Sequence, residues 1–147
     1  MGWLSGFDEA GRPYEPGTDW AIYASHLWDY MHRFIVRYAQ RSTRLHHILR
    51  SDADDDFHDH PFDFVSVLLT AGYLEHLPGS ADQPFPSRTV YHPRFSVVRH
   101  KAGDFHRLEL VDGPVWTLCF TSKRLKSWGF LTPRGFVPWR EYVSRKP

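Results

Sequence analysis

The sequence predicts an all-β fold, a small double-sheet jelly roll preceded by one short helix. Short apolar or alternating runs follow one another along most of the chain, separated by turns that contain Gly and Pro. Aromatic residues make up 16% of the chain, with six Trp, seven Tyr and eleven Phe, which favours strands and large packed side chains. A chain of 147 residues is expected to fold around one core, so residues 1–147 are predicted to be a single domain.

The N-terminal part differs from the rest. Residues 1–18 lack periodicity, and we expect an arm that packs on its own barrel or on a partner subunit, with a disordered tail as the alternative. Residues 19–32 are predicted to form a helix, with Thr18 or Asp19 as its cap. Its apolar stripe has helical spacing and consists of Trp20, Tyr23, Leu27, Tyr30 and Met31.

Residues 33–147 are predicted to form the β-barrel. The period changes after the helix, and each run that follows has the length and alternation of a strand. The predicted strands are 34–38, 45–50, 64–69, 73–76, 88–92, 94–100, 106–111, 115–120, 127–131 and 136–139. The last two close a hairpin around the turn at residues 132–135.

Composition excludes several classes of function. The net charge is +1 with basic and acidic residues interspersed, so no nucleic-acid partner is expected. Cys119 is the single cysteine, which rules out an internal disulfide and fits a reducing compartment. Neither a signal peptide nor a membrane-spanning segment is expected, and the predicted location is cytoplasmic.

Two histidines, His58 and His60, are the first candidate metal ligands. In a strand, residues two apart point to one face, so the pair would offer two imidazoles to one divalent transition metal. The apolar run that follows ends at Gly72, as a buried strand would. The alternative is a pair of partly exposed strand histidines, one hydrogen-bonded and one solvated.

A third histidine, His106, favours the metal interpretation. It follows Gly103, which is expected in a turn, and it begins a run that enters the core as a strand. His100 could also approach the metal region, but the Gly103-x-x-His106 spacing places His106 better.

These motifs resemble those of the cupin superfamily. The first cupin motif is HxH, then a Glu four or five residues on, and a Gly that closes the strand; the second places a His three residues after a Gly. His58, His60 and Gly72 match the first motif, and Gly103 and His106 match the second, within a resemblance that covers about residues 44–130. It implies a cupin-type double-stranded β-helix.

The chain also departs from the cupin pattern. Phe64 and Val65 stand where the Glu ligand is expected, so the resemblance implies a three-histidine site similar to that of thiol dioxygenases. That branch carries a His and a Tyr on the following strand, where this chain has Cys119 and Thr121. Asp63 is a candidate fourth ligand, if a bulge at Pro61 turns it inward.

A small organic molecule is the expected substrate. Guanidinium groups offer bidentate donors to a carboxylate or phosphate, and aromatic side chains would line an apolar binding site. The candidate substrate-binding residues are Arg37, Arg44, Arg50, Phe64, Tyr73 and Trp116. Ordinary surface positions are the alternative for each arginine.

Three imidazoles on one face leave coordination positions open, which favours a catalytic over a closed structural site. Fe(II) is the preferred metal, with Mn, Ni, Zn and Cu as alternatives. We therefore expect a non-haem Fe(II) oxygenase. The alternatives are a metal-dependent lyase or isomerase of small acids or sugars, and a non-catalytic ligand-binding cupin. A homodimer is the expected assembly.

Overall fold

The computed structural model describes residues 20–27, 29–52, 55–80 and 87–145, and these ranges contain twelve strands and one short helix. The all-β prediction is confirmed. The strands are β1 (Trp20–Leu27), β2 (Met31–Tyr38), β3 (Arg41–Ile48), β4 (Phe57–His58), β5 (Phe64–Leu68), β6 (Tyr73–Leu77), β7 (Arg88–His92), β8 (Val97–His100), β9 (Arg107–Leu110), β10 (Val115–Thr121), β11 (Gly129–Thr132) and β12 (Gly135–Pro138), and the helix is α1 (Trp139–Ser144).

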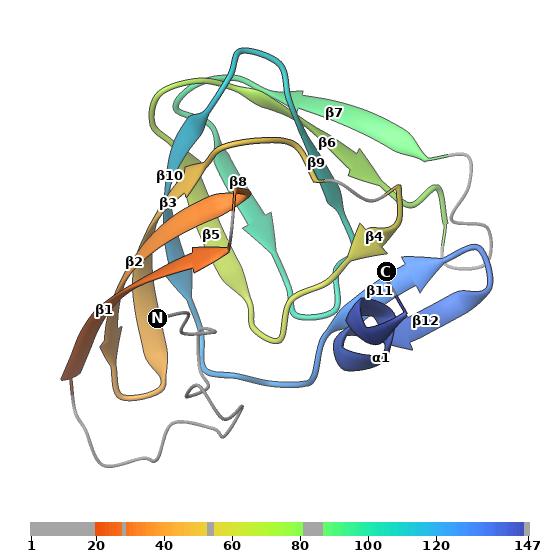
Figure 1. The fold of residues 1–147 in the computed structure, drawn as a ribbon. Helices are drawn as coiled ribbons and strands as arrows, with labels where there is room; N and C mark the ends of the chain where they lie inside the picture. Colours follow the sequence, from red (N-terminus) through yellow and green to blue (C-terminus); the bar gives the residue numbers. More distant parts are fainter. Residues whose placement is uncertain (1–19, 28, 53–54, 81–86, 146–147) are drawn as a thin grey trace.

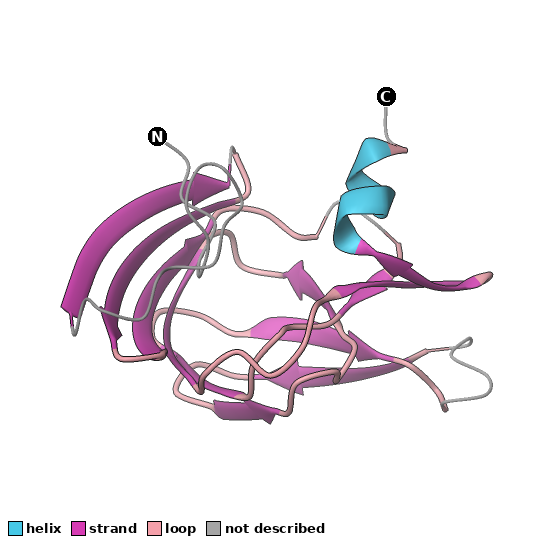
Figure 2. Ribbon diagram, turned by 90° about the horizontal axis from the view of Figure 1, so that it is seen from below, coloured by secondary structure: helices cyan, strands magenta, loops and turns pink. Residues whose placement is uncertain are grey.

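The described strands form three antiparallel sheets, whose arrangement Figure 1 shows. The largest has the order β1-β2-β3-β10-β5-β8 and curves strongly across its width (Figure 2). The sheet β7-β6-β9 and the sheet β12-β11-β4 complete the enclosure. Strands β1, β2 and β3 follow one another in the chain, whereas β10, β5 and β8 come from distant parts of it, as in a double-sheet jelly roll.

Alternation within each strand separates the two faces of the large sheet. Along β10, Val115, Thr117, Cys119 and Thr121 are buried, and the residues between them are more exposed. The hydrophobic core lies between this sheet and the β7-β6-β9 sheet. It consists of Met31, Ile48, Leu68, Tyr73, Val98 and Leu108. Burying each of these side chains stabilises the fold by about 1.5–3 kcal/mol.

The predicted helix over residues 19–32 is wrong. Residues Trp20–Leu27 form β1, which pairs in antiparallel register with β2 along its whole length, from Trp20 opposite Tyr38 to Leu27 opposite Met31. Apolar residues spaced three and four apart in this segment fit a helix. The β-branched and aromatic residues of the same segment suit a strand equally well. Pairing with β2 satisfies the backbone and decides between the two.

Other predictions about the elements have mixed outcomes. The C-terminal hairpin is confirmed as β11 and β12, with Thr132 opposite Gly135. Helix α1, which follows it directly, was not predicted. The arm over residues 1–18 lies outside the described residues. None of the described helices is long and apolar enough to cross a membrane.

The β12-β11-β4 sheet is fixed to the barrel next to the histidine pair. Asp59 is fully buried; its Oδ1 accepts a hydrogen bond from the Gly129 amide at 2.8 Å, and Lys126 Nζ pairs with its Oδ2. From α1, the Tyr142 ring stacks on Phe130 at 3.8 Å and its hydroxyl donates to Asp56 at 2.8 Å. These contacts hold β4, and therefore His58, against the C-terminal elements.

Candidate metal centre

His58 and His106 are held opposite each other by their own backbones. His58 is the last residue of β4, and His106 immediately precedes β9. The two form an isolated antiparallel bridge in which each amide donates to the other's carbonyl oxygen at 2.9 Å. The ring centroids are 4.8 Å apart. Two segments that are distant in sequence therefore present their imidazoles side by side.

His60 completes the group from the loop after β4. Its Nε2 lies 3.0 Å from Nε2 of His106, and its ring centroid lies 5.1 Å from that of His58. One ligand atom from each of the three histidines lies within 4.8 Å of the others. The sequence predicted both histidines of the pair on one strand, whereas only His58 is in β4 and His60 belongs to the loop.

A buried carboxylate, Glu75 on β6, orients one of these imidazoles. Its Oε2 accepts hydrogen bonds from His106 Nδ1 at 2.7 Å and from His100 Nε2 at 2.6 Å. Its Oε1 lies 3.1 Å from His92 Nε2. The proton on His106 Nδ1 is thereby directed at the carboxylate, which leaves the lone pair on His106 Nε2 facing the other two histidines.

Burial keeps the two β4-side histidines neutral. It lowers the pKa of His58 to about 4, against the opposite influence of Asp52, whose Oδ2 lies 3.7 Å from His58 Nδ1. Burial and the neighbouring His58 hold the pKa of His60 well below its usual value. A neutral imidazole has the lone pair that a metal requires, so no proton has to be displaced from these two rings at pH 7.

The carboxylate beneath the group is ionised. Burial alone would raise the pKa of Glu75, but the hydrogen bonds from His100 and His106 outweigh it and hold the pKa well below its usual range. In turn, burial would lower the pKa of His100, but the hydrogen bond to Glu75 outweighs it and raises that pKa. Negative charge under His106 strengthens the imidazole as a ligand.

The three histidines are chemically suited to a divalent transition metal, because neutral imidazole nitrogens are among its common ligands. Nε2 of His60 and Nε2 of His106 lie 3.0 Å apart, and one ligand atom of each of the three rings lies within 4.8 Å of the others. Three protein ligands would leave coordination positions open for water or substrate.

Phenylalanine rings surround one side of the group. The Phe64 ring centroid lies 4.9 Å from that of His60 and 6.1 Å from that of His106. Phe62 stacks against His60 at 5.8 Å, and the guanidinium carbon of Arg44 lies 4.6 Å from the Phe62 ring centroid. Phe64 and Arg44 were both predicted as substrate-binding residues. Phe64 lies beside the histidines, and Arg44 is separated from His60 by the Phe62 ring.

The structure does not bring the other predicted residues to the histidines. Asp63 accepts a hydrogen bond from the Ala102 amide at 2.7 Å, and its carboxylate is not part of the histidine group. Trp116 points to the outer face of the large sheet, where it stacks on His47 at 4.1 Å. The physical reason is strand alternation, since Val115 and Thr117 occupy the inner face.

Arg50 and Tyr73 also lie elsewhere. Arg50 pairs with the exposed Asp29 at 3.1 Å on the surface. Tyr73 is 3% exposed and belongs to the hydrophobic core, and burial raises the pKa of its hydroxyl. Arg37 lies on the inner row of the large sheet, in register with Ser42.

One residue of the centre, Glu75, was not predicted from the sequence. Glu75 does not occupy a position of either cupin motif, and only the pairing of β6 with β9 brings it next to His106. The spacing of Tyr73 and Glu75 was a usable signal, because residues two apart on the strand predicted over 73–76 share one face, and here that face is the buried one. His100, which the sequence predicts near the metal region but less well placed than His106, forms a second possible ligand group with Glu75 and His106.

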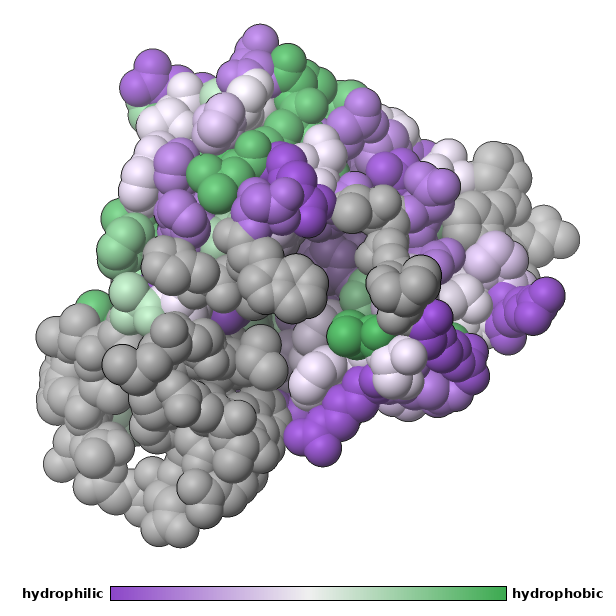
Figure 3. All heavy atoms as spheres, in the orientation of Figure 1, coloured by the Kyte–Doolittle hydropathy of each residue, from purple (hydrophilic) through white to green (hydrophobic). Residues whose placement is uncertain are grey.

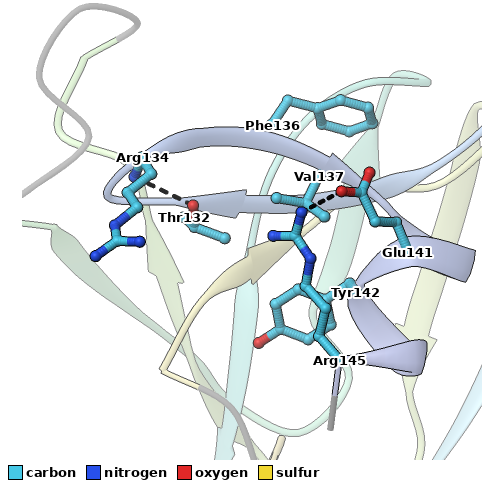
Figure 4. A pocket seen from close by; sticks show the side chains of 7 residues that line it. All are labelled: Thr132, Arg134, Phe136, Val137, Glu141, Tyr142 and Arg145. Carbon is cyan, nitrogen blue, oxygen red and sulfur yellow. Dashed lines mark hydrogen bonds and ion pairs between the residues drawn. The ribbon is translucent and has the colours of Figure 1, made fainter.

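A separate surface pocket of about 420 Å³ lies by the C-terminal elements (Figure 4). It is lined by Thr132, Arg134, Phe136, Val137, Glu141, Tyr142 and Arg145. Arg145 pairs with Glu141 four residues before it in the pocket wall, and no histidine of the metal group lines the pocket. On the face shown in Figure 3, the described hydrophobic residues are interspersed with hydrophilic ones.

Fold and site together define a class, a cupin-like β-barrel with a three-histidine group that could hold a metal ion. No family model matches the sequence, and no curated protein matches it.

Solved structures share the fold at low sequence identity. An Fe(II) structure of HppE has a TM-score of 0.54 at 12% identity over 80% of this chain and 64% of that chain. Hydroxypropylphosphonic acid epoxidase from S. wedmorenis has a TM-score of 0.52 at 13% identity over 79% and 61%. A structure from work on the DMSP lyases RdDddP and RnDddQII has a TM-score of 0.51 at 12% identity over 71% and 62%. This chain spans about three-fifths of each of those chains.

Proposed function

We propose that the protein is a metal-dependent enzyme that acts on a small organic molecule, with His58, His60 and His106 as the metal ligands. The observation that carries the proposal is the convergence of three imidazoles, two of them neutral by burial, within 4.8 Å of one another. An ionised carboxylate behind His106 supports it, because such a partner fixes the tautomer that binds metal.

Fe(II) is the proposed metal, and oxygenation is the proposed reaction. Three imidazole ligands suit iron among the first-row transition metals and would leave coordination positions open, which supports this choice. One structure with the same fold is an Fe(II) form of HppE. When bound, Fe(II) would supply the redox chemistry that lets dioxygen react with an organic substrate.

The protein's own residues would position the ligands and limit water. Glu75 and the bridge to His58 hold His106 in one orientation. Phe62 and Phe64 shield the His60 side, so the substrate would meet an apolar wall next to the imidazoles.

A metal-dependent lyase is the second candidate. It is supported by the fold shared with the DMSP lyase structure. The two reactions differ in their need for oxygen, so substrate turnover that continues under anaerobic conditions would favour the lyase.

Metal binding is the first test. Protein loaded anaerobically with Fe(II) and desalted is expected to retain close to one iron per chain by elemental analysis. His106→Ala should lower the affinity by more than about 100-fold, because changes behind a ligand alone cost 10–100-fold. His76→Ala is the matched control, since His76 bonds Glu109 at 2.7 Å outside the group.

Oxygen uptake with amino acids, thiols and small acids then separates the two reactions. Wild type that retains no metal, or His106→Ala that retains as much as wild type, would remove the basis of the proposal.

A further inference from the structure

The outer face of the large sheet carries a row of apolar side chains that crosses five strands. In an antiparallel sheet, residues that lie directly opposite each other point to the same face. Leu118 on β10 lies opposite Leu45 on β3 and Val67 on β5. Leu45 lies opposite Phe34 on β2, and Val67 lies opposite Val97 on β8. We call Phe34, Leu45, Leu118, Val67 and Val97 the apolar row.

The apolar row points away from the barrel interior. The next residues along β2, β8 and β10 point to the interior, and they are buried: Ile35, Val98 and Cys119. At the two ends of the row, Phe34 is 47% exposed and Val97 is 53% exposed, and the three residues between them are half-buried. A contiguous exposed apolar surface of this kind marks a site of protein association.

Aromatic residues flank the apolar row on both sides. Phe120 on β10 is 43% exposed and lies opposite Val65 on β5. On the other side of the row, the half-buried Trp116 stacks on His47 at 4.1 Å. Phenylalanine and tryptophan are enriched at the centres of protein interfaces, where their rings supply a large contact area.

Charged side chains are scarce on this face. Among the outward-pointing residues of β2, β3, β10, β5 and β8 in the row and in the registers beside it, only Arg99 is an arginine, lysine, aspartate or glutamate. A nucleic acid, an anionic membrane or a charged protein segment would therefore find little to pair with. An uncharged apolar face is the complement of this surface, and a second copy of the chain supplies one.

The exposed apolar area reaches what a small specific dimer needs. A fully exposed aromatic side chain offers about 200 Å². With the exposures of Phe34, Phe120 and Val97, and smaller parts from the half-buried residues between them, the face offers about 500 Å² in one copy. Two such faces packed together would remove about 1,000 Å² from water, which is the lower limit for a specific interface.

We propose that two copies of the chain associate through the outer face of the large sheet, with the apolar row at the centre of a two-fold symmetric interface. In such a contact both copies use the same surface, and sheets pack face to face about 10 Å apart. Phe64, beside His60, alternates with Val65 and so points to the other face of β5. The association is therefore independent of the proposed metal-dependent function.

Sedimentation equilibrium of the wild-type protein is the first test. One chain has a mass of 17.3 kDa, and twice that mass is expected at micromolar concentrations. A wild type that stays monomeric at about 100 μM would overturn the proposal, because a dimer that weak has less affinity than specific interfaces have. Masses that keep growing with concentration would also contradict it, because a two-fold contact closes at two copies.

Matched substitutions then locate the contact. Phe34→Glu and Phe120→Glu place a carboxylate at positions that are partly exposed in the single chain, so little of its own packing is lost. Each should weaken dimerisation at least about 30-fold, because the two-fold axis buries the new charge twice without a partner. Phe136→Glu is the control, since Phe136 is 49% exposed on β12, which is not part of the large sheet. The same affinity in all three folded variants would overturn the proposal.

A measurement on the wild type does not depend on whether the variants fold. Mixing ¹³C-labelled with unlabelled chains gives dimers in which isotope-filtered NMR detects only contacts between the two copies. Such contacts are expected from the methyl groups of Leu118 and Val67 to aromatic protons of the second copy. Contacts between copies that arise only from another surface, such as the edge of β1 or helix α1, would assign the dimer to that surface and overturn the proposal.

Discussion

At the scale of single residues, the second nitrogen of each histidine decides what the first can do. His106 directs Nδ1 at Glu75 and Nε2 at His60, at 2.7 and 3.0 Å. His76 engages Glu109 and Thr89 instead, and is left with no role in the group. Ten histidines occur in the chain, so the partner of each ring distinguishes a candidate ligand better than its residue type does.

Replacing the carboxylate of Glu75 tests its positioning role. Glu75→Gln should weaken metal binding about 10–100-fold, because the amide carries no charge and turns N–H groups toward at least one of His92, His100 and His106. The affinity is measured by competition with a chelator. Glu109→Gln removes a similar carboxylate–histidine contact outside the group, and it should leave the affinity unchanged. Equal effects of the two substitutions would contradict the role assigned to Glu75.

At the scale of elements, close packing of strands explains the glycine at the end of the first motif. A Cβ at Gly72 would lie 2.5 Å from the carbonyl oxygen of His92, the last residue of β7. Only glycine lets β7 approach this closely, and β7 carries the histidine that contacts Glu75 Oε1. The glycine that resembles a motif position therefore has a packing reason in this fold.

Gly72→Ala is expected to lower the free energy of unfolding by about 1–3 kcal/mol, because the backbone of β7 must shift to accept the methyl group. Urea unfolding measures the loss. Metal affinity should also fall, since the shift moves His92 away from Glu75. Gly113→Ala is the control: it has open space but a φ of +75°, so it should cost stability through strain and leave metal affinity unchanged. An unchanged stability of Gly72→Ala would show that β7 is not closely packed there.

At the scale of the whole molecule, two groups of polar side chains lie on the inner faces of the sheets. The carboxylate of Glu75 contacts three histidines, and Arg33, Arg44 and His46 lie on the inner side of β2 and β3. Between them Cys119 is 4% exposed, in register with Arg44. Burial raises the pKa of the Cys119 thiol to about 11, against the opposite influence of Arg44.

This raised pKa makes stability depend on alkaline pH. Above about pH 8.5 the unfolded chain loses the thiol proton and the folded chain keeps it, so unfolding is favoured as pH rises toward 11. The contribution is full below pH 8.5, and about 2–3 kcal/mol is lost by pH 11. In urea unfolding at pH 7, 9 and 10, the free energy of unfolding of the wild type should therefore fall relative to that of Cys119→Ala as the pH rises. Parallel pH profiles of the two proteins would disprove the buried, protonated thiol.

Most strands and the three histidines of the site could be predicted from the sequence, because each lies in a short recognisable pattern. The strand runs after residue 33 follow from short-range patterns, whereas the grouping of His106 with His58 and His60 was expected from the resemblance to the two cupin motifs. The wrong helix over residues 19–32 shows the limit of such patterns, because apolar spacing alone does not reveal that β2 is available as a pairing partner. The prediction that Trp116 lines the binding site was wrong for a related reason. A one-residue error in the phase of a strand exchanges its inner and outer faces.

By itself, the sequence determined an all-β barrel and the three imidazoles that could share one ion. Only the tertiary structure decided that Glu75 lies beneath His106 and that Arg33, Arg44 and His46 share one inner face. The physical reason is that strand register brings together residues far apart in the chain, and no spacing along the sequence encodes that register.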